Sequence, residues 1–425
     1  MLNTAFAPWP VFSEAEIEAV QQVLRSGRVN YWTGSECREF EREFAHWCGT
    51  THAIAVANGT VALDLALRGL GIGAGDEVVV TPRTFMASAS CVVNAGAIPV
   101  FADVDADSGN ISAATISRVL TPRTRAIVCV HLAGWPCDMD PIMALAREHG
   151  IKVIEDCAQA HGARYKGRSV GSIGDVGAWS FCQDKIMTTG GEGGMITIND
   201  DALWRTMWSY KDHGKSYAAV YEKQHPPGFR WLHESFGTNW RMTEMQAVIG
   251  RIQLQMLPEW TAARHAHASA LYAALLPFAD DVIRLPEFSF AGQPGASSAT
   301  VCGSAQEQSS HAQYKFYAYV RPERLADGWS RDRIVEAINA EGVPCYQGTC
   351  SEVYLEKAFD STGWRPSSAL PTTQELGQTS LMFLVHPTLT QDQIQKRCEA
   401  IAKVLSQASA RHDTEITHGH DTALL

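Results

Sequence analysis

The sequence predicts an α/β protein with a three-layer α/β/α large domain, built on a mainly parallel sheet, and a smaller C-terminal α+β domain. Three observations support this fold class. Short apolar, β-rich runs alternate with helical stretches between about residues 50 and 200. A long amphipathic helical pattern follows them. The chain has 425 residues, enough for two or three domains.

The predicted elements begin with a helix in the run SEAEIEAVQQVLRSG. Ser13 and Glu16 form a capping-box pattern at its start, and Gly27 can cap its other end. The strands predicted after it cover residues 53–58, 77–81, 98–101, 126–131, 152–157, 177–181 and 194–198. Because ligands bind outside the carboxyl ends of the strands in such sheets, we expect the functional residues to lie there.

A second helix is predicted in TEMQAVIGRIQLQML, and we expect Pro258 to end it. This gives a large domain over residues 1–257, although its N-terminal helix could pack on the small domain, and a small domain over residues 258–408. Residues 289–312 have few large apolar side chains and are predicted to form a flexible loop. We expect residues 409–425 to be a disordered tail.

The composition argues against several classes of protein. The net charge is −11 and there is no long basic run, which disfavours a nucleic-acid-binding surface. The 11 cysteines form no CxxC pair, so neither a disulfide framework nor a metal site is indicated. The sequence lacks a signal-peptide pattern and an apolar run of membrane-spanning length. We therefore expect a cytoplasmic enzyme that does not bind membranes.

Three features converge on the carboxyl ends of the predicted strands. Asp156 ends the apolar run VIED, where an unpaired buried carboxylate is costly, so a cationic partner is expected. The alternative is an aspartate that caps a loop or pairs with a structural arginine. Gly59 and Thr60 open a helix after a strand and could receive an anion at its N-terminus, although such turns are common. In SFCQDKIMTTGGEGG, Ser180 leaves a strand and Lys185 follows it, either as a reactive amine or as a surface charge.

Together these features match the chemical needs of pyridoxal 5'-phosphate. The carboxylate of Asp156 would keep the pyridine nitrogen protonated, and Lys185 would form the Schiff base and move protons. The turn at Gly59 and Thr60, with Ser180, would hold the phosphate.

Three motifs make the assignment more specific. EDCAQAHGA, SFCQDKIMTTGGEGG and GTNWRMTEMQAVIGRIQL resemble, in order, the DegT/StrS-type sugar aminotransferase family of pyridoxal-phosphate fold type I. The resemblance runs from about residue 10 to about residue 405. It implies that Lys185 carries the cofactor, that Asp156 pairs with the pyridine nitrogen, and that Ser180 binds the phosphate. Gln159 would contact the ring hydroxyl or pack on the ring.

The resemblance also assigns residues outside these central positions. Phe85, in the run TPRTFMAS, would stack on the cofactor ring, and the alternative is a core residue. Asn239 would reach the phosphate of a neighbouring subunit, which implies a homodimer with shared active sites. For His161, Glu192 and Arg241 a structural role is at least as good an interpretation as a catalytic or binding one.

The implied reaction moves the amino group of L-glutamate to a keto sugar, most simply a nucleotide-linked one, for an amino sugar of a surface polysaccharide or secondary metabolite. Lys185 would act as general base in a ping-pong sequence. Lysine at this position disfavours the dehydratase relatives, which carry histidine there. The alternatives are a 3-amino-5-hydroxybenzoate synthase-like or cyclitol aminotransferase, or a non-catalytic cofactor-binding regulator.

A candidate site for the acceptor lies in residues 208–235. This segment combines tyrosines and tryptophans with Lys211, Lys215, Lys223 and Arg230. Such a segment could receive a diphosphate and stack a base, or it could be a solvated surface loop.

Overall fold

The computed structural model describes residues 6–224, 231–287 and 309–410. Its centre is a seven-stranded sheet with the order β1-β9-β8-β5-β4-β2-β3. The strands are β1 (His52–Val56), β2 (Glu77–Val80), β3 (Ile98–Phe101), β4 (Thr124–Val130), β5 (Lys152–Asp156), β8 (Val176–Ser180) and β9 (Gly194–Ile198). All neighbours from β3 to β8 pair in parallel, and β9 is antiparallel to both β8 and β1. The predicted strands and the mainly parallel sheet are confirmed.

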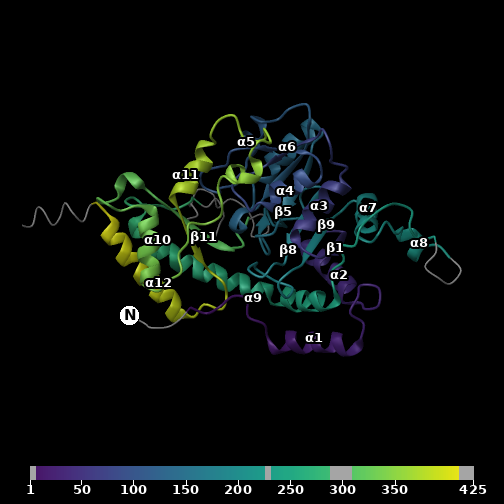
Figure 1. Cartoon of the computed structure of the whole chain (residues 1–425). Coiled ribbons are helices and arrows are strands. Elements are labelled where there is room, and N and C mark those ends of the chain that lie inside the picture. Colours follow the sequence, from purple (N-terminus) through teal and green to yellow (C-terminus); the bar gives the residue numbers. More distant parts are fainter. Residues whose placement is uncertain (1–5, 225–230, 288–308, 411–425) are drawn as a thin grey trace, which may run out of the picture.

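Helices cover both faces of this sheet (Figure 1). Alternate side chains of a strand point to opposite faces, so Val78 and Val80 join a different core cluster from Val79. The first face packs against α3 (Gly59–Gly69), α4 (Ala87–Asn94) and α7 (Asp201–Lys211). The second packs against α2 (Glu36–Cys48), α5 (Ala113–Ser117), α6 (Met139–His149) and the start of α9 (Glu244–Leu275). This is the predicted three-layer arrangement.

A smaller α+β unit is built around a three-stranded antiparallel sheet with the order β10-β11-β12. Its strands are β10 (Ile283–Arg284), β11 (Lys315–Val320) and β12 (Ser380–Leu384). Its core is completed by α10 (Arg331–Ala340), α12 (Gln391–Ala408) and the second half of α9. Further elements are α8 (Tyr217–Tyr221), α11 (Pro371–Thr379) and the short hairpin of β6 (Arg164–Tyr165) and β7 (Arg168–Ser169).

The prediction that Pro258 ends the second helix is wrong. Helix α9 continues through Pro258 to Leu275 and joins the two units, as Figure 1 shows. Proline inside a helix costs roughly 3 kcal/mol because it removes a backbone hydrogen bond and crowds the preceding turn. Packing against α1 (Glu14–Ser26), α2 and α12 along its length offsets that local cost. The domain division at residues 257 and 258 stays a prediction, with its boundary inside one helix.

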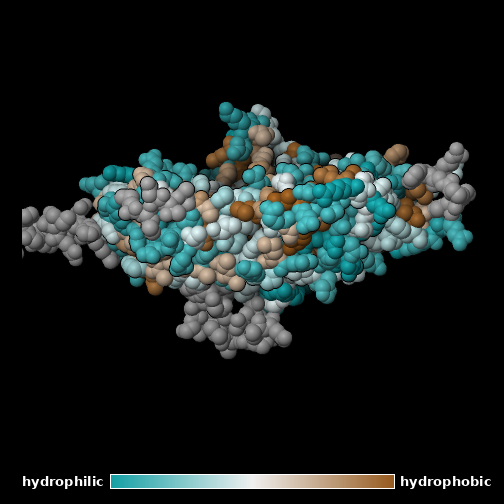
Figure 2. All heavy atoms as spheres, turned by 90° about the horizontal axis from the view of Figure 1, so that it is seen from below, coloured by the Kyte–Doolittle hydropathy of each residue, from teal (hydrophilic) through white to brown (hydrophobic). Residues whose placement is uncertain are grey.

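The N-terminal helix α1 has the predicted capping box of Ser13 and Glu16 and the left-handed Gly27 cap. It packs against the first half of α9, where Gln253 Nε2 donates a buried hydrogen bond of 2.8 Å to Glu16 Oε1. The helix is thus held by the part of α9 that faces the large sheet. Figure 2 views the molecule from this side and shows hydrophobic residues in patches among hydrophilic ones.

Two flexible-segment predictions fall largely outside the described residues. Within the predicted loop, residues 309–312 are described and are well packed: Ser310 pairs with Arg164, and His311 and Ala312 are buried. Ser310 adds its backbone to the β6–β7 hairpin at Arg164, and the flexible loop stays a prediction. Of the predicted tail, Ser409 is buried and pairs with Leu325. In the described ranges, no helix is long and apolar enough to cross a membrane.

Candidate active site

A cavity of about 460 Å³ lies at the carboxyl ends of β1, β2, β5 and β8. Seven of the eight residues predicted for the site line it: Gly59, Thr60, Phe85, Asp156, Gln159, Ser180 and Lys185. Asn239 is not among the lining residues. The parallel sheet thus brings together side chains from four strand ends that are far apart in the sequence.

Asp156 is the last residue of β5 and is buried at the base of the cavity. Its Oδ2 accepts a 2.8 Å hydrogen bond from Ser88 Oγ, and its Oδ1 accepts one of 3.1 Å from the Ala158 N–H. Burial raises the pKa of Asp156, although these hydrogen bonds and the charge of Lys185 oppose the rise. A cationic group bound beside Asp156 would reverse the direction of that shift.

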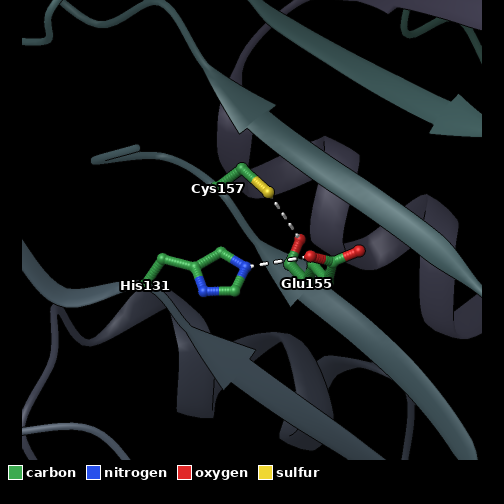
Figure 3. A group of neighbouring side chains, drawn as sticks. All are labelled: His131, Glu155 and Cys157. Carbon is green, nitrogen blue, oxygen red and sulfur yellow. Dashed lines mark hydrogen bonds and ion pairs between the residues drawn. The ribbon is translucent and has the colours of Figure 1, made fainter. Parts of the chain in front are cut away.

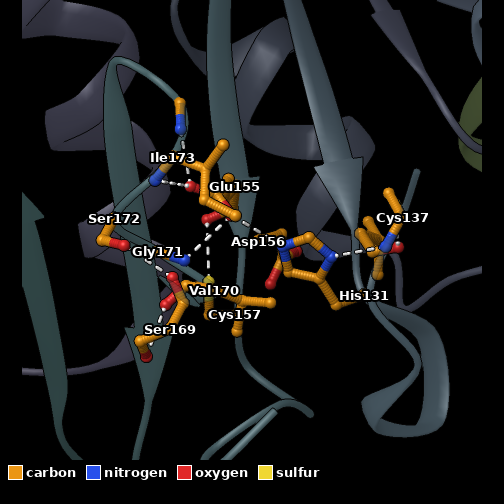
Figure 4. Close-up of polar contacts among 12 residues, drawn as sticks. His131, Cys137, Glu155, Asp156, Cys157, Ser169, Val170, Gly171, Ser172 and Ile173 are labelled. Carbon is orange, nitrogen blue, oxygen red and sulfur yellow. Dashed lines mark hydrogen bonds and ion pairs between the residues drawn. The ribbon is translucent and has the colours of Figure 1, made fainter. Parts of the chain in front are cut away.

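A second buried carboxylate, Glu155, anchors the strand behind Asp156 (Figures 3 and 4). Its oxygens accept hydrogen bonds of 2.7–2.9 Å from the N–H groups of Gly171, Ile173 and Gly174. His131 Nδ1 accepts a 3.0 Å bond from the Cys137 N–H, so His131 Nε2 carries the proton that it donates to Glu155.

The side chains of His131, Glu155 and Cys157 lie close together, and all three residue types can bind a metal ion (Figure 3). The carboxylate of Glu155 and both ring nitrogens of His131 are already occupied by hydrogen bonds, and Cys157 Sγ lies 3.6 Å from the Glu155 carbonyl. Burial also raises the pKa of the Cys157 thiol well above its usual value, which disfavours the thiolate that metals bind. We therefore interpret this group as structural.

Lys185 projects from the turn after β8, and its side chain is 17% exposed. Its Nζ lies 3.4 Å from Asp184 Oδ1 and 5.3 Å from the centre of the Tyr314 ring. Tyr314 donates a hydrogen bond to Asp184 Oδ2. Burial acts to raise the pKa of Asp184, but the charge of Lys185 and this hydrogen bond lower it overall. Asp184 is therefore a carboxylate that pairs with Lys185 at the edge of the cavity.

The turn from β1 into α3 forms a tight cradle with the end of β8. Asn58 caps α3 by accepting a 3.0 Å hydrogen bond from the Val61 N–H. A Cβ atom at Gly59 would lie only 2.5 Å from Ser180 Cβ and 2.8 Å from Ser180 Oγ. Only glycine lets this backbone approach Ser180, which places a hydroxyl group beside the N-terminus of an 11-residue helix.

Phe85 and Gln159 line the cavity in different ways. The Phe85 side chain is 70% exposed, so the core interpretation of this residue does not hold in the described chain. An exposed ring at a cavity mouth is available to stack on a planar ligand. Gln159 Oε1 accepts a 2.8 Å hydrogen bond from the Ala133 N–H, which turns the NH₂ end of the amide into the group that can donate elsewhere.

Asn239 is exposed and lies away from the cavity of its own chain. Its backbone pairs with Asp212, and its Oδ1 accepts a 3.4 Å hydrogen bond from the Arg241 N–H. Arg241 forms a 2.6 Å ion pair with the buried Asp212. This contact fits a structural role for Arg241 rather than binding of a substrate.

His161 and Glu192 also take structural positions. The His161 ring is completely buried against Trp179 and Phe181, and burial lowers its pKa to about 3. The carbonyl of Glu192 accepts hydrogen bonds from Thr189 and Gln246 across the glycine-rich turn. The Glu192 carboxylate nevertheless borders the cavity.

Sequence reasoning missed Ser88 and the pairing of Asp184 with Tyr314. Ser88 lies one helical turn after Phe85, a spacing that could have indicated a position facing the same cavity. Tyr314 is more than 100 residues from Asp184, so no local pattern could have joined them.

In residues 208–235, the segment predicted to bind the acceptor, the described lysines are already paired with carboxylates. Lys211 is buried beside Glu41 and lies 3.8 Å from the Tyr31 ring centre. Lys215 pairs with Asp212, and Lys223 pairs with Glu234 at the surface. Arg230 is outside the described residues. The structural interpretation therefore fits Lys211 and Lys215 better than a diphosphate site does.

A family model described as the DegT/DnrJ/EryC1/StrS aminotransferase family matches residues 10–402. The chain belongs to this family. It is 34% identical over 383 residues to dTDP-3-amino-3,4,6-trideoxy-alpha-D-glucose transaminase of Streptomyces venezuelae, covering 90% of each chain. It is 49% identical over 226 residues to GDP-perosamine synthase of Caulobacter vibrioides, covering 53% of this chain and 58% of that protein.

The fold of the chain is also similar to that of solved structures. The X-ray structure of the aminotransferase from Psychrobacter cryohalolentis matches with a TM-score of 0.90 and 62% sequence identity, covering 95% of this chain and 99% of that one. The predicted family and α/β fold class are thereby confirmed, and the protein is an aminotransferase.

Proposed function

We propose that the protein is a pyridoxal-phosphate-dependent enzyme that moves the amino group of L-glutamate to a keto sugar, most simply a nucleotide-linked one. One observation carries this proposal. The amine of Lys185, the buried carboxylate of Asp156 and the cradle of Gly59 and Ser180 line one cavity.

The residues of the cavity fit this cofactor. Asp156 is a buried carboxylate without a salt bridge to any described residue, which suits a protonated ring nitrogen. The Gly59 backbone beside Ser180, at the start of α3, suits a phosphate group. Phe85 offers an exposed ring to cover one side of a planar group.

The chemistry then divides among the residues. When bound, the cofactor supplies a carbonyl that joins covalently to amines and a ring that accepts an electron pair. Asp156 would hold a proton on the ring nitrogen, and the hydrogen bond from Ser88 keeps the carboxylate in place. Lys185 would carry the cofactor and, as general base, would take a proton from the donor Cα and return it later in the reaction. Asp184 keeps the Lys185 side chain within the cavity between these steps.

The acceptor class rests on the relatives. Both named relatives act, by their names, in the formation of nucleotide-linked amino sugars. The alternatives, a cyclitol or a 3-amino-5-hydroxybenzoate precursor, carry no nucleotide. Binding of GDP, UDP or dTDP to the purified protein would favour the sugar-nucleotide acceptor, and binding of none of them would favour these alternatives.

We also propose a homodimer with shared sites. The exposed Asn239 lies outside the cavity of its own chain, and Trp231 and Phe236 beside it are 86% and 99% exposed. Further exposed apolar side chains lie along the N-terminal region: Val11, Phe12, Ile17, Leu24 and Val29. Large apolar side chains that are this exposed would be covered at a protein interface. Light scattering should give twice the chain mass of 46.4 kDa, and a monomer at working concentration would contradict the proposal.

The decisive variant is Lys185→Ala. We expect it to abolish transamination, because no other described lysine lines the cavity. Lys223→Ala is a matched control, since Lys223 is an exposed lysine paired with Glu234. Substantial transamination by Lys185→Ala would refute the assignment.

A further inference from the structure

A second cavity of about 440 Å³ adjoins the first. Asp184 lines both cavities, and Tyr314 of the second cavity lies against the Nζ of Lys185. The N-terminal segment closes one side of it, and there Trp9 Nε1 donates a 2.8 Å hydrogen bond to the Lys185 carbonyl. The second cavity is therefore tied directly to the turn that carries the reactive lysine.

The wall of this cavity contains three cationic side chains, which are Arg264, Lys315 and Arg397. Arg264 is 1% exposed and Arg397 is 0% exposed. Within the described ranges, Asp184 is the only acidic residue in the lining. Its carboxylate already accepts a hydrogen bond from Tyr314 and lies 3.4 Å from Lys185 Nζ. The cavity therefore carries an excess of buried positive charge.

The two arginines are poorly satisfied by the protein. Nε of Arg264, and both Nε and Nη2 of Arg397, are buried without a hydrogen-bond partner among the described residues. Arg264 Nη1 makes only long contacts of 3.4 Å to the carbonyls of Gln313 and Tyr314. Arg397 Nη1 donates to the Leu384 carbonyl. An unpaired buried guanidinium is costly unless a ligand completes it.

The pKa values of the basic groups in this cavity are lowered, as expected where positive charges lie close together. The pKa of Lys315 is lowered to about 8, mainly by burial and also by the charges of Arg264 and Lys185, whereas Asp184 opposes the fall. Burial, Arg264, Arg397 and Lys315 lower the pKa of His386 to about 3, so this histidine is neutral. Aromatic rings also face these cations: Arg264 lies 5.3 Å from the Trp9 ring and Lys315 lies 4.5 Å from the Tyr314 ring.

We propose that this cavity is an oxyanion-binding site, which takes a carboxylate or phosphate group of a substrate that reacts at Lys185. The inference rests on the proposed function for the identity of that substrate. The anion would pair with Lys315 and with the unpartnered nitrogens of Arg264 and Arg397, the geometry that guanidinium groups favour with planar or tetrahedral oxyanions. The two possible sources are a carboxylate of the amino donor and a phosphate of the acceptor.

The test is calorimetric binding of two unreactive probes, glutarate and inorganic pyrophosphate, to the cofactor-loaded enzyme. Lys315→Met removes the charge and keeps most of the side-chain volume, and Lys403→Met is the control at an exposed lysine that pairs with Glu341. We expect Lys315→Met to weaken one probe by roughly tenfold to a hundredfold, the range for a charge-assisted hydrogen bond. Loss of glutarate binding identifies a carboxylate as the ligand, and loss of pyrophosphate binding identifies a phosphate.

A second measurement needs only the wild-type protein and covers failure of Lys315→Met to fold. An anion beside Lys315 raises its pKa, so binding near pH 8 should take up protons, which calorimetry in two buffers detects. Absence of binding by both probes, or binding that Lys315→Met leaves unchanged, would overturn the oxyanion site. Anion binding without transamination would refute the proposed function alone, and transamination without anion binding would refute this inference alone.

Discussion

Asp156 and Lys185 are polar groups held inside the protein by a few specific partners. Sequence alone indicated both residues, because a carboxylate at the end of an apolar strand and a lysine before a glycine-rich turn are unusual. It could not indicate Ser88 as the partner of Asp156 or Tyr314 as the partner of Asp184, since both contacts depend on chain folding over long separations. Single residues of the site were therefore predictable, and their supporting contacts were not.

His161 provides a prediction about pH at this scale. Its pKa falls from an ordinary value of 6.5 to about 3 through burial, so it stays neutral in the folded protein. Between these values the unfolded chain binds one more proton than the folded chain, and stability must fall as the pH falls. For this one group the slope approaches about 1.4 kcal/mol per pH unit.

The expected result is that His161→Leu weakens the loss of stability between pH 6.5 and pH 4, measured by chemical denaturation at several pH values. His46→Leu, at an exposed histidine on α2, should keep the wild-type pH dependence. Equal pH profiles for His161→Leu and the wild-type protein would contradict the buried neutral state.

The elements were predictable where local signals agreed with packing. The seven strands carry β-rich apolar runs, and the caps of α1 and α9 carry their capping boxes. The continuation of α9 beyond Pro258 was not predictable, because contacts with α1, α2 and α12 decide it rather than the local sequence. The pairing of Ser310 with Arg164 of β6 was not predictable for a similar reason, since the two residues are far apart in the sequence.

The junction of α3 with β8 carries a prediction at the element scale. In Gly59→Ala the new methyl group would lie 2.5 Å from Ser180 Cβ, so the helix must move away from the strand. We expect a loss of about 1–3 kcal/mol in the free energy of unfolding. Weaker binding of pyridoxal phosphate, measured by titration of the apoprotein, should accompany it.

Gly73→Ala is the matched control for this change. A Cβ atom there meets nothing closer than 3.7 Å, so stability and cofactor affinity should stay near those of the wild-type protein. If Gly59→Ala binds the cofactor as tightly as Gly73→Ala does, the cradle of α3 and Ser180 does not hold the phosphate.

At the scale of the whole molecule, the site depends on both units of the chain. The sheet supplies Lys185 and Asp156, and the smaller unit supplies Tyr314 and the cations of the adjoining cavity. Helix α9 and the N-terminal segment connect the two units beside this junction. The α/β class was predictable from strand and helix rhythm, but the way in which the smaller unit closes against Lys185 was not.

The most direct measurement is the absorbance spectrum of the purified, cofactor-loaded protein before and after addition of L-glutamate. The account predicts that the band of the cofactor joined to Lys185 disappears on addition, and that a band at shorter wavelength replaces it, because the donor amino group has been transferred. Lys185→Ala should lack the first band. A wild-type protein that never forms this band after loading, or one whose band ignores L-glutamate, would contradict the central claim that Lys185 and Asp156 serve transamination from this donor.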